Sequence, residues 1–89
     1  MEPRRAIERA VRARAILEDE LVAQAFAAIE RRAHDGWAHS RPEDRELRER
    51  AYRELRALQA FKAEFEKLIR DGRLAEAESR SRQGAEERQ

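Results

Sequence analysis

Cysteine is absent from this chain, and residues that break helices are few. The 89 residues include two prolines and three glycines, and 6% of them are aromatic. Without cysteine the chain has no disulfide framework and no thiolate metal site, as is typical of proteins from a reducing compartment. The expected location is therefore the cytoplasm, and the expected number of domains for this length is one.

Long apolar runs are also missing. No segment approaches the ~20 apolar residues that a membrane-spanning helix needs. The basic start of the chain, Arg4-Arg5, is followed by Glu8, Arg9 and Arg12 rather than by a continuous apolar stretch. We therefore expect neither a signal peptide nor a membrane partner.

Charge is abundant but balanced. Charged residues make up 44% of the chain, and the net charge is +1, which is too small to indicate a polyanionic partner. Apolar residues make up 40%, but many of them are alanine. The core should therefore be thin, which favours packing against another chain.

The N-terminal part of the chain has helical periodicity from about residue 4 to residue 34, after Pro3 in a first turn. Apolar residues recur there every three or four positions: Ile7, Val11, Leu21, Val22, Ala25, Phe26, Ile29 and Ala33. Asp19 can cap a second helix, so the pattern allows either one long helix or two segments that are broken near Asp19.

A turn should separate this region from a second helix at about residues 41–70. Gly36 can take the left-handed conformation that ends a helix, and Pro42 resists continuing one. Ser40 and Glu43 have the spacing of a capping box, which marks a helix start, and Asp71-Gly72 marks its end.

These elements predict an all-α fold, an antiparallel helical hairpin of two long amphipathic helices. The hairpin domain should span residues 1–75. Residues 76–89 contain no large apolar side chain, so we expect a disordered polar tail there.

Catalytic and metal-binding patterns are weak. His34 and His39 flank Gly36 at a spacing that lacks the fixed geometry of a helical pair of ligands, and no further ligands are evident. No cleft is expected to separate the pKa values of paired carboxylates such as Glu18 with Asp19. The three serines are Ser40, the expected cap, and Ser79 and Ser81 in the predicted tail. We expect no enzyme, no cofactor, no metal and no small-molecule substrate.

Two surfaces are candidates for binding. Arg5, Arg9 and Arg12 lie on one helical face that can follow a phosphate backbone, although the same pattern is typical of an ordinary solvated face. Trp37 can cover the end of the hairpin or anchor a partner, whereas Tyr52 projects away from the apolar face and favours an interface. The predicted interface comprises Ile7, Val11, Leu21, Phe26, Trp37 and Tyr52.

The sequence also resembles a group of small, uncharacterised phage and prophage proteins encoded near head and packaging genes. The matching segments are Leu17-Glu18-Asp19-Glu20-Leu21, Ala25-Phe26, Trp37, Ser40-Arg41-Pro42-Glu43-Asp44, Arg48-Glu49-Arg50-Ala51-Tyr52, Leu55, Leu58 and Asp71-Gly72-Arg73-Leu74-Ala75. Tyr52 departs from the more frequent tryptophan, and Arg45 from a common threonine. The resemblance transfers no functional residue and implies a virion or prophage accessory protein, so the expected location widens to cytoplasmic or virion-associated.

Three functions follow as hypotheses. The first is a non-catalytic phage-type structural or packaging accessory protein, which self-associates as a homo-oligomer or docks on a larger assembly through its helices. The second is a packaging accessory that binds nucleic acid non-specifically through Arg5, Arg9 and Arg12. The third is a regulatory protein that presents one helix to a host factor.

Overall fold

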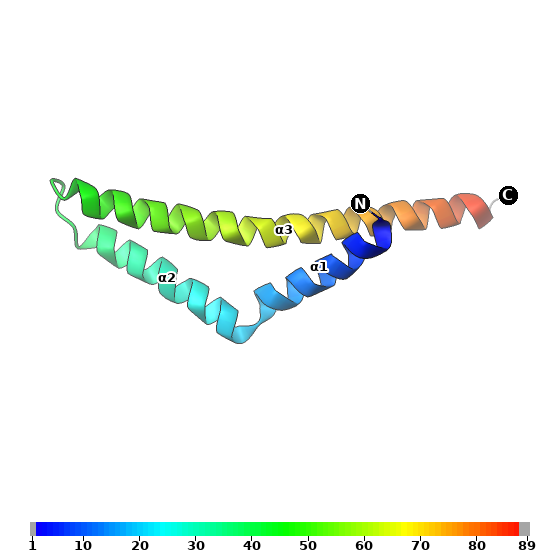
Figure 1. Ribbon diagram of the computed structural model, residues 1–89, viewed down its shortest axis with the longest axis horizontal. Coiled ribbons are helices and arrows are strands. Elements are labelled where there is room, and N and C mark those ends of the chain that lie inside the picture. Colours follow the sequence, from blue (N-terminus) through cyan, green and yellow to red (C-terminus); the bar gives the residue numbers. More distant parts are fainter. Residues whose placement is uncertain (1, 88–89) are drawn as a thin grey trace. The chain divides into compact units, whose positions relative to one another are not determined.

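The computed structural model describes residues 2–87, and over this range the chain forms three helices and no strand (Figure 1). These helices are α1 (Pro3–Glu18), α2 (Glu20–Ala38) and α3 (Arg45–Glu87). The prediction of an all-α protein is confirmed. No helix in the described range is both long enough and apolar enough to cross a membrane.

The helices are divided between two compact units. The central unit is Glu18–Ala63, in which α2 and the first part of α3 run antiparallel. The terminal unit contains the residues up to Leu17 and those from Glu64 onward, so α1 runs antiparallel to the last part of α3. Each unit is thus a pair of helices.

The break between α1 and α2 falls at Asp19, which decides between the two alternatives that the sequence allowed. Asp19 has an extended backbone, with φ −62° and ψ 128°, and its carboxylate accepts a hydrogen bond of 3.1 Å from the backbone N–H of Val22. This bond satisfies a donor that the first turn of α2 would otherwise leave unpaired. The predicted cap is therefore present, and the N-terminal region contains two helices.

The end of α2 lies later than the sequence predicted. α2 continues through Gly36 to Ala38, and no described residue has a positive φ, so the prediction of a left-handed Gly36 is wrong. Instead, the backbone N–H of His39 donates to the carbonyl of Asp35 at 2.9 Å, and the Ser40 hydroxyl donates to that of Trp37 at 2.6 Å. Because these groups satisfy the last carbonyls, no glycine is needed to end the helix.

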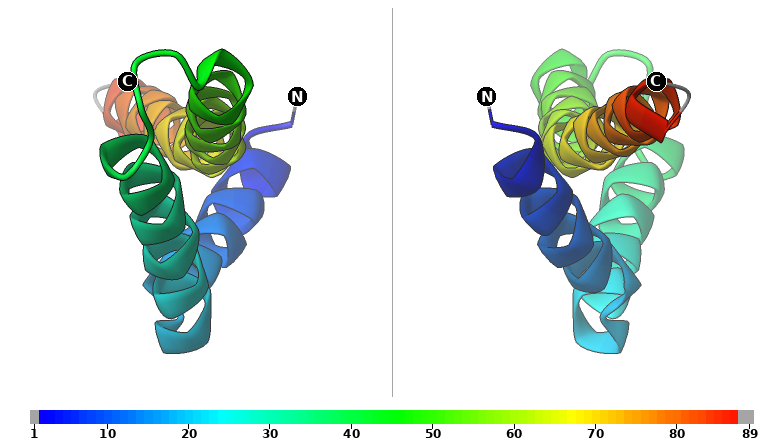
Figure 2. Two further views of the ribbon diagram at one scale, coloured as in Figure 1. Left: turned by 90° about the vertical axis from the view of Figure 1, so that its left-hand side faces the viewer. Right: turned by 90° about the vertical axis from the view of Figure 1, so that its right-hand side faces the viewer.

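The predicted start of the second helix is also wrong. α3 begins at Arg45 rather than Arg41, after a turn in which the Asp44 carboxylate accepts a hydrogen bond of 3.0 Å from the backbone N–H of Arg41. Ser40 forms no capping box with Glu43, because its hydroxyl is bonded to Trp37 and Arg48 instead. Figure 2 (left) shows the short connection from α2 to α3 that contains this turn.

Gly72 does not end a helix, contrary to the prediction. α3 continues to Glu87, so the predicted polar tail is helical over residues 76–87, and residues 88–89 lie outside the described range. Gly72 is buried against α1 within the terminal unit: a Cβ added there would overlap with that of Ala10 and lie 3.1 Å from the Ala6 carbonyl oxygen. Glycine is needed here because the two backbones approach closely.

The core is thin, as the composition predicted. The buried apolar residues are small except for Leu58, which is 6% exposed. The others are Ala6, Ala13 and Ala75 in the terminal unit and Ala33 and Ala51 in the central unit. Most large apolar side chains are therefore only partly covered by the chain itself.

Candidate functional site

The strongest candidate site lies in the central unit, where the end of α2 faces the start of α3. The guanidinium carbon of Arg48 lies 4.5 Å from the centroid of the Trp37 ring, which is a cation–π geometry. The Nε of Arg48 also donates a hydrogen bond of 2.9 Å to the hydroxyl of Ser40. Because that hydroxyl in turn donates to the carbonyl of Trp37, the three residues hold one another in place.

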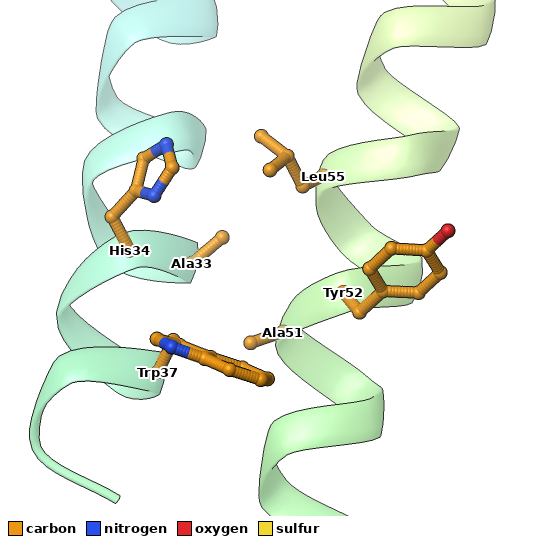
Figure 3. A pocket seen from close by; sticks show the side chains of 6 residues that line it. All are labelled: Ala33, His34, Trp37, Ala51, Tyr52 and Leu55. Atoms are coloured by element: carbon orange, nitrogen blue, oxygen red, sulfur yellow. The ribbon is translucent and has the colours of Figure 1, made fainter.

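A hollow of about 240 Å³ opens beside this cluster. In Figure 3 the Trp37 ring extends from α2 toward α3, and the methyl groups of Ala33 and Ala51 point toward each other between the helices. The Tyr52 ring points away from α2. The hollow is lined by Ala33, His34, Trp37, Ala51, Tyr52 and Leu55. Apart from the His34 ring and the polar atoms of the two large aromatics, this lining is apolar.

A second hollow, of about 300 Å³, shares Trp37 and Tyr52 with the first. Its remaining lining residues are Pro42, Arg45, Arg48 and Glu49. We call the residues that line the two hollows the Trp37 surface. An apolar depression and a charged one thus lie next to each other, separated by two aromatic side chains.

The charges at this surface are unevenly paired. The Glu49 carboxylate lies 3.1 Å from the Nη2 of Arg53, so its charge is already partnered. Neither Arg45 nor Arg48 forms an ion pair with any carboxylate in the described part of the chain. Two cationic side chains therefore stand beside the aromatic hollow without a partner of opposite charge.

The predicted interface residues belong to both units. Ile7 and Val11 belong to the terminal unit, where Val11 is 64% exposed and Ile7 is half-buried. In the central unit Leu21 is exposed, and Phe26 packs edge to face on Phe61 with ring centroids 6.0 Å apart. Within the central unit, Trp37 and Tyr52 lie together, where both line the two hollows.

The predicted nucleic-acid residues lie on α1 in the terminal unit. Arg5 and Arg12 are exposed, whereas Arg9 is half-buried. The neighbouring Arg4 pairs with Glu8 at 3.7 Å, but none of the three predicted arginines forms an ion pair in the described range. Their charges are thus available to an anion.

Sequence reasoning missed the role of Arg48 and the buried face of α1. On α1 the buried residues are Ala6 and Ala13, whereas Ala10 and Ile7 are half-buried and Val11 is exposed. The signal was the helical spacing of these alanines, matched on α3 by Gly72, Ala75 and Ser79. Arg48 lies eight residues after Ser40, across a turn, so no local pattern connects the two.

The two histidines have different surroundings. The Nδ1 of His39 lies 2.8 Å from the carbonyl oxygen of Asp35, at the end of α2, whereas His34 lines the first hollow. Among the residues that the structure describes, no three histidine or acidic side chains come together in a way that could hold a metal ion.

These features define a class: an all-helical chain whose clearest site, among the residues that the structure describes, is an aromatic and cationic surface. Comparisons with models of protein families, with curated proteins and with solved structures found no match. The function therefore has to be argued from the chain itself.

Proposed function

We propose that this chain is a non-catalytic accessory protein that acts by helix-mediated self-association or by docking on a larger protein assembly. One observation carries the proposal: among the described residues, Leu58 is the only large apolar side chain that is buried. Eight large apolar side chains are exposed instead: Val11, Ile16, Leu21, Trp37, Leu47, Tyr52, Phe61 and Leu74. A structural or packaging role of phage type rests on the sequence resemblance alone.

The physical reason is the free energy that burial of this exposed apolar surface would contribute. Removing apolar surface from water stabilises a complex by about 25 cal/mol per Å². Tyr52 and Trp37 are 61% and 48% exposed, and large aromatics of this kind dominate the energy of protein interfaces. Trp37 on α2 and Tyr52 on α3 line the same two hollows of the central unit. A second protein surface that covered them would gain most of this energy.

The test is the native mass of the purified protein by light scattering, over a wide concentration range and at low and high salt. A defined oligomer that persists at high salt supports apolar self-association. A monomer that captures a specific protein from cells supports docking on an assembly. A monomer at every concentration that captures no protein contradicts the proposal.

Nucleic-acid binding is a second candidate, favoured by the absence of ion pairs at Arg5, Arg9 and Arg12. Binding to phosphates through these residues would weaken steeply as salt increases. The test is the affinity for a DNA duplex at several salt concentrations, for the native chain and for a variant with glutamine at all three positions. Equal affinities would remove this arginine face from consideration.

A further inference from the structure

We propose that the Trp37 surface binds an acidic, amphipathic helical segment of a protein partner. One large apolar side chain of that segment occupies the first hollow, and a carboxylate about one helical turn away pairs with Arg48. The inference rests on the proposed function, since it names the chemistry of the partner for docking. It names the Trp37 surface among the exposed apolar regions because Arg48 is held there by two contacts, with the Trp37 ring and with the Ser40 hydroxyl.

Arg48 is prepared for a carboxylate by its surroundings. The cation–π contact with Trp37 and the hydrogen bond from Nε to Ser40 restrict the motion of the guanidinium. Both terminal nitrogens remain as donors, because no other partner is present in the described range. Carboxylates accept parallel hydrogen bonds from such a fork, and a side chain that is already ordered loses less entropy on binding.

The first hollow has the size and lining of a socket for a side chain. Its volume, about 240 Å³, is below the range of about 300–1,000 Å³ that is typical of small-molecule sites. Its floor includes the buried Ala33 and Ala51, so a knob from another helix can enter between α2 and α3. A groove between two helices that accepts the apolar face of a third is a recurrent mode of peptide recognition.

Charge selects the partner among apolar segments. Among the residues that line the two hollows, Glu49 is partnered by Arg53, whereas Arg45 and Arg48 are not partnered, so the charge of this lining is positive. Glu43, Asp44 and Glu46 lie with Arg45 in an adjoining depression, which leaves Arg48 as the cation that meets the partner. A basic segment would face repulsion there, and an acidic one would be attracted. Trp37, Tyr52 and His34 offer rings to a base as well, but the other three lining residues, Ala33, Ala51 and Leu55, are aliphatic and match an apolar side chain better than a polar base.

The first experiment is selection from a display library of random 16-residue peptides on the immobilised full chain. The enriched sequences should place aspartate or glutamate within four positions of leucine, phenylalanine or tryptophan. A synthetic peptide with the enriched sequence should then bind in solution, as measured by fluorescence polarisation. Enrichment of neutral or basic sequences, a failure to enrich any sequence, or equally tight binding of a 20-nucleotide single strand would overturn the proposal.

Variants locate the site. Arg48→Gln should weaken binding of the selected peptide about tenfold, the effect of losing a hydrogen bond to a charged group. Arg48→Lys keeps the charge but not the planar guanidinium group, so its affinity should lie between those of the native chain and Arg48→Gln. The matched control is Arg80→Gln, at an exposed arginine of the terminal unit. Equal affinities of Arg48→Gln and Arg80→Gln would contradict the role of Arg48.

Trp37→Ala tests the aromatic wall and should also weaken binding about tenfold or more, as truncation of a hot-spot aromatic does. Circular dichroism of each variant must match that of the native chain, and Trp37→Phe replaces Trp37→Ala if it does not. The same variants distinguish a failure of this inference from a failure of the proposed function. Should a defined oligomer or a captured partner survive Arg48→Gln and Trp37→Ala unchanged, helix-mediated assembly stands and the acidic segment is wrong.

Discussion

In the terminal unit the buried side chains are alanines that meet a glycine, whereas in the central unit Leu58 is buried and Phe26 packs edge to face on Phe61. Small residues let two helix backbones approach closely and leave little room for change. In the central unit the buried Ala33 and Ala51 line a hollow beside Trp37. The terminal unit thus pairs its helices by a close approach of backbones at Gly72, whereas the central unit leaves a hollow of about 240 Å³ beside Trp37.

The largest change in the free energy of unfolding is expected in the central unit. Leu58→Ala should lower the free energy of unfolding by about 2–4 kcal/mol, because it removes the only large side chain that is buried in the described range. Urea unfolding followed by circular dichroism measures the loss. The matched control is Leu47→Ala, at a leucine that is 43% exposed, and it should cost under about 1 kcal/mol. Similar losses for both variants would mean that Leu58 is not a core residue.

In the terminal unit the corresponding change adds a methyl group rather than removing one. Gly72→Ala should lower the free energy of unfolding by about 1–3 kcal/mol, because the new Cβ overlaps with the methyl group of Ala10. The control is Gly36→Ala, at a helical glycine with no atom within 4 Å of the added Cβ. There the same substitution should raise the free energy of unfolding by about 0.5–1 kcal/mol.

The same substitution should lower the free energy of unfolding at Gly72 and raise it at Gly36. Thermal unfolding of both variants therefore distinguishes close packing of two helices from a general effect on helix propensity. Amide hydrogen exchange sharpens the result. Gly72→Ala should accelerate exchange first in residues 2–17 and 64–87, and Leu58→Ala first in residues 18–63. Uniform acceleration by both variants would show that the two units unfold as one.

A smaller effect is expected at the junction between α1 and α2. Asp19→Ala should lower the free energy of unfolding by about 1 kcal/mol, since the backbone N–H of Val22 loses its acceptor. Asp19→Asn keeps an acceptor at this position and should restore most of the loss. If both substitutions cost the same, the capping hydrogen bond does not stabilise α2, and charge is the relevant property.

The smallest effect is expected for an exposed ion pair. Glu49→Gln removes the ion pair with Arg53. Because the side chains of Glu49 and Arg53 are 53% and 76% exposed, this should lower the free energy of unfolding by at most about 0.5 kcal/mol. The difference from the native chain should shrink in high salt. A loss that is larger than this and insensitive to salt would mean that Glu49 has a further structural role beside the Trp37 surface.

Helix content and one cap could be predicted from the sequence because both depend on local patterns. Apolar residues recur at helical spacing, and Asp19 precedes an amphipathic run, so the two-segment alternative was available before the structure. The predicted ends at Gly36 and Gly72 and the predicted start at Arg41 were wrong, because side-chain hydrogen bonds around the turn and one contact between helices decided them. Ser40 bonds to Arg48 across the turn, and Gly72 meets Ala10, a residue far away in the sequence.

For the candidate site, the sequence indicated Trp37 and Tyr52 but not why they matter together. They lie fifteen positions apart on different helices, and only the pairing of α2 with α3 places them on one hollow. The alanine seam was overlooked for a different reason. Attention to large apolar residues favoured Ile7 and Val11, whereas the close approach of backbones selects the smallest side chains.

The placement of the aromatic residues also determines what optical spectroscopy can detect. Trp37 is the only tryptophan and Tyr52 the only tyrosine, and both line the same hollow in the central unit. Fluorescence of the native chain therefore monitors that hollow and is blind to the terminal unit, whose one aromatic residue among those described is Phe65. A ligand that quenches or shifts the emission reports its own arrival at the Trp37 surface without any added label.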